Sequence, residues 1–199
     1  RPRFRVRTER RWFSLRRCAT RRSRTSPSRL RLAGVRINPR NNATHGAFYY
    51  ASYAVKRLPD GPDVRVELPS GARLGRPFWN PGGTMFAFTN MTDTSVELWV
   101  ADAATAKAKR IDGVALNPVL GYGFNWMPDQ KTLVVKTVPP DRAAPPKETP
   151  APLGPHIEES GAVKAASSTY EARDLRQTPY DADLFEYYAT SQVALVDTS

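Results

Sequence analysis

The apolar residues of this chain alternate with small or polar residues in short runs, which is the period of a half-buried β-strand. Two such runs occupy residues 84–90 and 96–102, and a third follows at 131–138. Turn sequences separate the runs, such as the Asn-Pro-Gly-Gly turn at residues 80–83, where proline fixes φ and glycine accepts a positive φ. The pattern therefore predicts that these three runs are strands of antiparallel sheets.

A repeat of 47 residues underlies this pattern. Each copy begins with a tryptophan and a proline two residues apart, and then continues as an apolar strand. Four-stranded blades of about 40–45 residues, each burying its faces against its neighbours, are typical of a β-propeller. The sequence therefore predicts an all-β fold, a partial β-propeller of about two to three four-stranded blades. The matched positions are Trp79 with Trp126, Pro81 with Pro128 and 97–102 with 192–197, and a weaker copy stands at Ile37-Asn38-Pro39.

The repeat is interrupted after residue 138. Residues 139–155 contain seven prolines, which favour an extended and irregular chain. Residues 169–188 are predicted to be helical, with Thr178 followed by proline and then an acid at the third helical position, which is typical of a helix N-terminus. We therefore expect a proline-rich and helical insert at about 139–188 within the later blade, on one face of the propeller. Inserts of this length often shape access to a site.

Charge divides the chain at residue 31. The first 31 residues contain 13 arginines, no lysine and one acid, so the formal net charge of +11 arises there. We expect residues 1–31 to be a disordered arginine-rich tail that packs on nothing, or an out-of-frame translation of GC-rich DNA, and residues 32–199 to be the partial propeller. A targeting peptide and a nucleic-acid-binding arm are the alternatives, although we do not expect a nucleic-acid partner.

The residues with catalytic potential are few, and none of them forms a known site motif. The G-x-S-x-G nucleophile elbow is absent, and the two histidines, His45 and His156, lie outside the strand context that a catalytic triad needs. Glu158-Glu159 are adjacent, and the turn at 121–123 lacks the third glycine and the helix of a phosphate loop. We therefore expect no catalytic, cofactor-binding or metal-ligating residue and no cofactor. We also expect no disulfide, because Cys18 is the only cysteine, and no membrane span.

The turn at residues 79–83 and the strand at 97–102 resemble propellers with a W-S-P-D-G turn and an L-W-V-x-D strand. Such propellers occur in TolB-like proteins and in the N-terminal part of serine peptidases of the prolyl oligopeptidase family. The ordered set of motifs over residues 32–199 looks closest to the glutamyl endopeptidase-like branch of that family. Asn80 and Gly82 depart from the usual Ser and Asp, so this turn is expected to lose the bond from the Asp side chain.

The resemblance implies that peptide hydrolysis belongs to a C-terminal α/β-hydrolase domain of the same polypeptide. This chain is then a non-catalytic fragment, inactive alone, whose propeller restricts the access of large substrates. Its expected partners are that hydrolase domain and the peptide substrates of the parent. The alternative function is a TolB-like propeller acting as a protein-binding module. Parents of this type can be exported, so an exported or periplasmic parent is one interpretation, and the compartment and the peptide specificity stay open.

Overall fold

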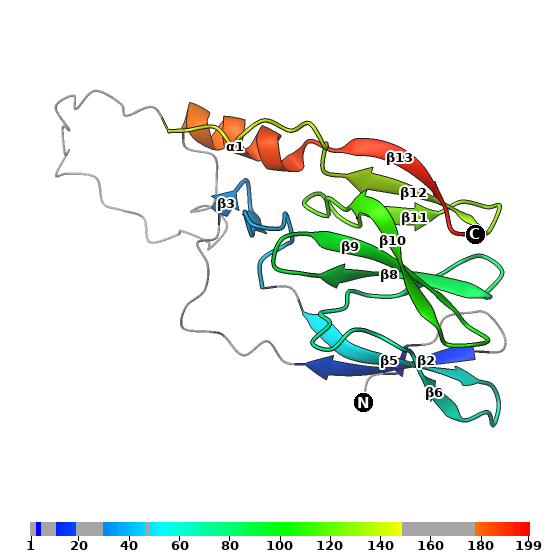
Figure 1. Cartoon of the computed structure of the whole chain (residues 1–199). Helices are drawn as coiled ribbons and strands as arrows, with labels where there is room; N and C mark the ends of the chain where they lie inside the picture. The colour runs from blue at the N-terminus through cyan, green and yellow to red at the C-terminus, as the bar shows by residue number, and fades with distance from the viewer. Residues whose placement is uncertain (1–2, 5–10, 19–29, 47, 149–177) are drawn as a thin grey trace, which may run out of the picture.

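The computed structural model describes residues 3–4, 11–18, 30–46, 48–148 and 178–199, and these are mainly antiparallel strands (Figure 1). Two four-stranded sheets, a three-stranded sheet and a two-stranded hairpin follow one another, and the described part contains one helix. The predicted all-β fold class is confirmed. The elements are β1 Arg3–Phe4, β2 Arg11–Cys18, β3 Leu30–Leu32, β4 Val35–Ile37, β5 Tyr49–Arg57, β6 Asp63–Arg65, β7 Phe78–Trp79, β8 Met85–Met91, β9 Val96–Asp102, β10 Ala108–Ala115, β11 Phe124–Trp126, β12 Thr132–Thr137, α1 Pro179–Ala189 and β13 Gln192–Asp197.

The repeat seen in the sequence is reproduced in the register of the strands. The sheet of β7, β8, β9 and β10 and the sheet of β11, β12 and β13 are both antiparallel, with each strand beside the next one in the chain. Positions 47 residues apart occupy the same places in the first two strands of each sheet, and positions 95 apart do so in the third. The predicted strands at 84–90, 96–102 and 131–138 are therefore confirmed. The equivalent pairs are Trp79 opposite Phe86 and Trp126 opposite Leu133, then Met85 opposite Asp102 and Thr132 opposite Asp197.

The weaker copy at Ile37 shares the turn of the other two copies. Ile37 is bridged to Thr44, as Trp79 is opposite Phe86, and the Asn38 N–H donates to the Ala43 carbonyl as the Asn80 N–H donates to the Met85 carbonyl, each at 2.9 Å. Ile37 also lies in β4, which pairs with β3 through a tight turn at Ala33 and Gly34, both of which have positive φ. The strand that follows, β5, pairs with β2 and β6.

The expectation that residues 1–31 pack on nothing is wrong for β2 and β3. The backbone of β2 pairs with β5 from Arg11 opposite Arg57 to Cys18 opposite Tyr49. The physical reason is that the backbone N–H and C=O groups of β5 require partners, and an extended segment supplies them whatever charge its side chains carry. The predicted disorder of residues 1–2, 5–10 and 19–29 falls outside the described residues.

The central sheet, β7 to β10, is buried on both faces. Phe86 and Phe88 of β8 point to one side and pack with Tyr53 and Val55 of β5. Ala87, between them in the sequence, belongs to the opposite face together with Leu98, Val100, Leu133 and Val135. Successive residues of a strand point to opposite faces, so one strand serves both cores. The sheets thus stack face to face in chain order, as blades of a propeller do (Figure 1).

Helix α1 begins where the sequence predicts. The Thr178 hydroxyl accepts a hydrogen bond from the Asp181 backbone N–H, the Asp181 carboxylate accepts one from the Thr178 N–H, and Pro179 is the first helical residue. This reciprocal cap satisfies donors that a helix start would otherwise leave open. Leu184 and Tyr188 are buried against the β3–β4 hairpin. The helix predicted for 169–177 falls outside the described residues.

Two buried asparagines hold the C-terminal end of α1. The Asn117 amide donates to the carbonyl oxygens of Tyr188 and Thr190, each at 2.9 Å. The Asn42 amide donates to the Tyr188 carbonyl at 3.1 Å and to the Asn117 side-chain oxygen at 3.2 Å. Arg142 completes the cluster with a hydrogen bond to the Asn42 side chain at 3.2 Å. The last carbonyl groups of a helix have no partner within the helix, so this cluster supplies one and directs the chain into β13.

The two equivalent turns cap the same backbone groups with different side chains. In the turn after β11, the Asp129 carboxylate accepts hydrogen bonds from the N–H groups of Lys131 and Thr132. In the turn after β7, the buried Asn80 amide oxygen accepts from the equivalent N–H groups of Thr84 and Met85, at 2.9 and 3.1 Å. The turn was expected to lack the hydrogen bonds of an Asp side chain, because position 82 is glycine. The Asn80 side chain supplies those bonds instead.

We predict that this exchange can be reversed. Asn80→Ala should lower the free energy of unfolding by about 2 kcal/mol, because the N–H groups of Thr84 and Met85 lose their acceptor. Adding Gly82→Asp should recover about half of that loss, since a carboxylate at 82 stands where Asp129 stands in the other turn. Urea denaturation of the full chain, of Asn80→Ala, of Gly82→Asp and of the double variant measures both effects. If the changes in the free energy of unfolding caused by the two substitutions simply added, the two side chains would not be equivalent acceptors, and the prediction would be contradicted.

The edge strand β13 exposes apolar side chains on its outer face. β13 pairs with β12 alone among the described strands, and Val193 and Leu195 are 67% and 68% exposed. Open apolar strand edges favour association between copies. We predict that replacing both residues by lysine increases the monomeric fraction in size-exclusion chromatography. Ala194→Lys is the matched control, because Ala194 packs inward against the second core and its replacement should instead lower the melting temperature.

Candidate functional site

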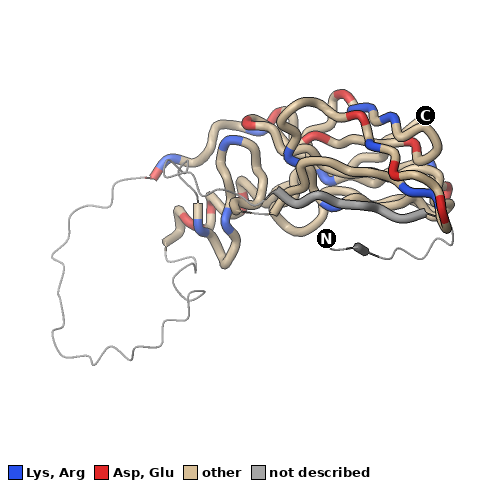
Figure 2. The backbone as a smooth tube through the Cα atoms, turned by 90° about the horizontal axis from the view of Figure 1, so that it is seen from below, with Lys and Arg blue, Asp and Glu red and all other residues tan. Residues whose placement is uncertain are grey.

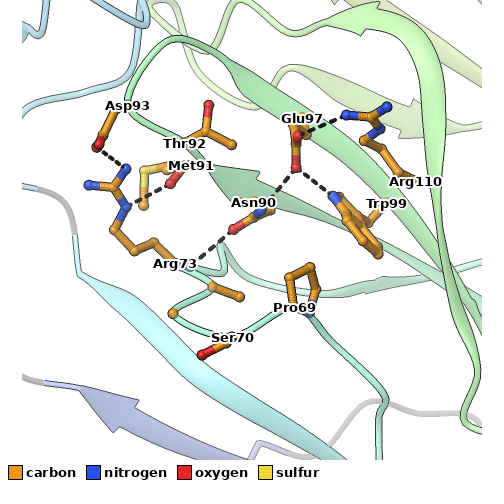
Figure 3. Close-up of a pocket in the computed structure, with 12 residues that line it drawn as sticks. Pro69, Ser70, Arg73, Asn90, Met91, Thr92, Asp93, Glu97, Trp99 and Arg110 are labelled. Atoms are coloured by element: carbon orange, nitrogen blue, oxygen red, sulfur yellow. Dashed lines mark hydrogen bonds and ion pairs between the residues drawn. The ribbon is translucent and has the colours of Figure 1, made fainter.

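A polar cavity of about 730 Å³ lies over the ends of β8, β9 and β10 (Figure 3). The segment from Pro69 to Arg73 forms one wall, and Glu97, Trp99 and Arg110 form the other. Strand pairing places these side chains together, since Asn90 is the cross-strand partner of Glu97 and Arg110 is that of Trp99. Glu97 and Trp99 are two residues apart on β9, so their side chains emerge on the same face.

Glu97 is the centre of the network in this cavity. One carboxylate oxygen accepts hydrogen bonds from the Asn90 amide at 2.9 Å and the Trp99 indole N–H at 2.8 Å, and the other accepts from Arg110 at 3.3 Å. Burial acts to raise the pKa of Glu97, but the hydrogen bonds from Trp99, Asn90 and Arg110 outweigh it and hold that pKa below its ordinary value. Glu97 is therefore ionised at neutral pH and is poorly suited to donate a proton.

Arg73 closes the other side of the cavity. Its guanidinium donates to the carbonyl oxygen of Met91 and to the carboxylate of Asp93, both at 2.7 Å, and its backbone N–H donates to the Asn90 side chain at 3.0 Å. The charged groups on both walls thus bind neighbouring side chains, and the lining contains neither histidine nor cysteine. This arrangement fastens a loop to the central sheet and does not present a nucleophile beside a base.

The candidate site residues considered from the sequence lie away from the Glu97 network. His45 is half-buried in the loop after β4, where its backbone N–H donates to the Arg36 carbonyl at 2.7 Å. The turn at 121–123 precedes strand β11 and no helix, and its Tyr122 ring lies 4.8 Å from that of Phe78. His156, Glu158-Glu159 and the side chain of Cys18 fall outside the described residues.

Two further findings concern the described residues as a whole. Within the described ranges, the His, Cys, Asp and Glu side chains form no group of three that could hold a metal ion. The one helix of the described part is too short and too polar to cross a membrane.

The Glu97 network and the asparagine cluster were not predicted from the sequence. The alternation in 96–102 placed Glu97 and Trp99 on one face, which was the available signal for the first. No such signal existed for Asn42 and Asn117, which are 75 residues apart and meet only through the packing of α1.

Comparison with known proteins gives two curated relatives. A probable glutamyl endopeptidase, chloroplastic, of Oryza sativa subsp. japonica is 33% identical over 179 residues, which cover 83% of this chain and 19% of the relative. The protein of the same name from Arabidopsis thaliana is 33% identical over 178 residues, with 83% and 18% covered. The chain thus spans about a fifth of the length of these relatives. No protein-family model matches it.

Solved structures give more distant similarity. The acylaminoacyl peptidase of Pyrococcus horikoshii superposes with a TM-score of 0.35 at 21% identity, covering 52% of this chain and 15% of that one. A structure from a study of two prolyl endopeptidases gives 0.38 at 20% identity, covering 59% and 18%. Both superpositions are too partial to define the fold, which follows from the strand pairing of this chain.

The identity to the curated relatives confirms the resemblance inferred from the motifs. Over most of its length the chain is similar to the glutamyl endopeptidases, in agreement with the order of motifs over residues 32–199.

We predict that Glu97 contributes a pH-dependent part of the stability. Its folded pKa is lowered, so the contribution is complete above the ordinary carboxyl pKa and is lost as the pH falls through the folded value. Glu97→Gln should reduce the free energy of unfolding at neutral pH by about 1–2 kcal/mol and remove that acid-dependent part. Asp112→Asn, which alters the exposed partner of the same Arg110, is the control. If the free energy of unfolding depended on pH in the same way in Glu97→Gln and in the unsubstituted chain, the prediction would be refuted.

Proposed function

We propose that this chain is the non-catalytic propeller part of a serine peptidase, whose hydrolysis takes place in an α/β-hydrolase domain of the same polypeptide. The observation that carries the proposal is the shared register of β7–β9 and β11–β13 in a chain related to glutamyl endopeptidases. The polar cavity supports a structural role, because its charged groups bind one another.

The proposed role of the propeller is to restrict the access of large substrates to the hydrolase domain. The central sheet is buried on both faces between its neighbours, and such close packing forms a rigid wall, which suits a barrier better than a catalytic surface. Helix α1, which lies between β12 and β13 in the chain, adds bulk to one part of that wall. Peptides small enough to pass are the proposed substrates of the parent.

The alternative is a propeller that acts as a protein-binding module. Exposed large apolar side chains support it, since Phe48, Leu120 and Tyr122 are 73%, 53% and 58% exposed. In that case the chain would bind its partner without any hydrolase domain.

We predict that the purified chain gives only background hydrolysis of fluorogenic peptides with Glu or Pro before the scissile bond. The reason is that its sequence contains no nucleophile elbow. Turnover that is blocked by a serine-directed fluorophosphonate would contradict the proposal.

A chimera tests the role itself. The aligned segment of the rice relative is replaced by this chain, and hydrolysis of short peptides and of a folded protein substrate is compared. Retained peptide hydrolysis with continued exclusion of the protein substrate supports the proposal. The control is the relative with the segment deleted, which should admit the larger substrate or lose folding.

A further inference from the structure

The sheet of β11, β12 and β13, the third sheet, has an apolar patch on its outer face, at one end of the stack of sheets (Figure 1). Val134 lies opposite Leu195, and Val193 is two residues before Leu195 on the same side of the sheet. Leu133 and Val135 point the other way, into the second core. Val134, Val193 and Leu195 therefore form one surface, the outer patch, of which the two residues of β13 are mostly exposed.

The outer patch corresponds position by position to a face that is covered in the central sheet. The spacings of 47 and 95 residues that relate the two sheets also relate the two faces. On the central sheet the three side chains are at most 2% exposed, because the face of β12 packs on them. The third sheet thus presents to its outer side a surface that accepts another sheet elsewhere in the same chain. The equivalent pairs are Val134 with Ala87, Val193 with Leu98 and Leu195 with Val100.

The border of the outer patch is more polar than that of its counterpart. Asn125 stands where the central sheet has Phe78, and Lys136 stands where it has Thr89. An apolar centre with a polar border is typical of an interface between separately folded molecules. The outer patch therefore favours association between molecules over a permanently buried core.

The charges at the two ends of the outer patch are complementary to each other. Lys136 lies opposite Val193 at one end, and Asp197 lies opposite Thr132 at the other. Basic and acidic residues are interspersed over the described strands (Figure 2), so local pairs decide the fit of this face. A two-fold axis that crosses the strands near Val134 reverses their direction, so the Lys136 end of one copy lies over the Asp197 end of the other, and this contact occurs twice.

We propose that two copies of this chain pair face to face through the outer patch, across such a two-fold axis. Val134 and Leu195 lie at the centre of the interface, and Lys136 of each copy approaches the partner's Asp197. Two sheets that pack in this way keep their strands within about 30° of each other, which suits a flat aliphatic patch. The pairing goes beyond the proposed barrier role and needs no hydrolase domain.

Sedimentation equilibrium of the full chain over a range of concentrations measures the pairing. We expect a reversible equilibrium between monomer and dimer. Val134→Lys places a charge at the centre of the interface and should raise the dissociation constant of the dimer about tenfold or more. Val64→Lys, which changes an exposed valine of β6, is the matched control and should leave that constant unchanged.

Three outcomes of this measurement would overturn the proposal. A chain that stays monomeric at every concentration would leave the outer patch to a further sheet of a longer polypeptide. Equal effects of Val134→Lys and Val64→Lys would show that the association does not use this face. A dimer that Val134→Lys leaves unchanged would be paired through the backbone edge of β13, because Val134 lies one strand inward from that edge.

Charge reversal tests the two-fold arrangement itself. Lys136→Glu and Asp197→Lys should each raise the dissociation constant about fivefold, because each sets like charges against each other in both contacts. The double variant exchanges the two charges and should return to within about twofold of the unsubstituted chain. The Lys136 ammonium also donates to the Leu120 carbonyl at 2.7 Å, but the loss of a purely internal bond would not be repaired in the double variant. Losses that simply add in the double variant would refute the pairing. Association is measured without any peptidase assay, so its outcome is independent of the hydrolase hypothesis.

Discussion

Burial of both faces of the central sheet is the constraint on which the rest of the structure depends. Phe86 and Phe88 face the first core and Ala87 faces the second, so a shift of β8 by one residue would force phenylalanine into the space of Ala87 and leave a cavity in the first core. That fixed strand sets the register of β7 and β9, and the second core then places β12 and β13. The polar cavity is a consequence, because the same pairing brings Asn90 opposite Glu97.

A second requirement is that the chain, after leaving the sheet at the end of β12, must return to it as β13. Asn42 and Asn117 meet this requirement by binding the carbonyl group of Tyr188, which would otherwise be buried without a partner, and Asn117 also binds that of Thr190 after the helix. Arg142 reinforces the junction by lying over the rings of Tyr187 and Tyr188. Residues far apart in the sequence therefore define where β13 begins, and the blade-like sheet is completed by side chains outside it.

The polar cavity and the outer patch illustrate opposite uses of charge. In the polar cavity Glu97 and Asp93 neutralise the arginines, and the result is a fastening between loop and sheet. On the outer patch Lys136 and Asp197 stand at opposite ends of the paired strands. The first arrangement serves stability, because each arginine there is held by a carboxylate.

The sequence alone determined the strands, the repeat of the two matched sheets and the Thr178 cap, because these depend on local period and on residues close in the chain. It indicated one face for Glu97 and Trp99 but could not supply Asn90 and Arg110, which join them only through pairing between strands. It also failed for β2, since its arginines predict repulsion while the open backbone of β5 decides the pairing. The asparagine cluster and the polar cavity were decided by tertiary structure, because their members lie on segments that approach one another only after the sheets have packed.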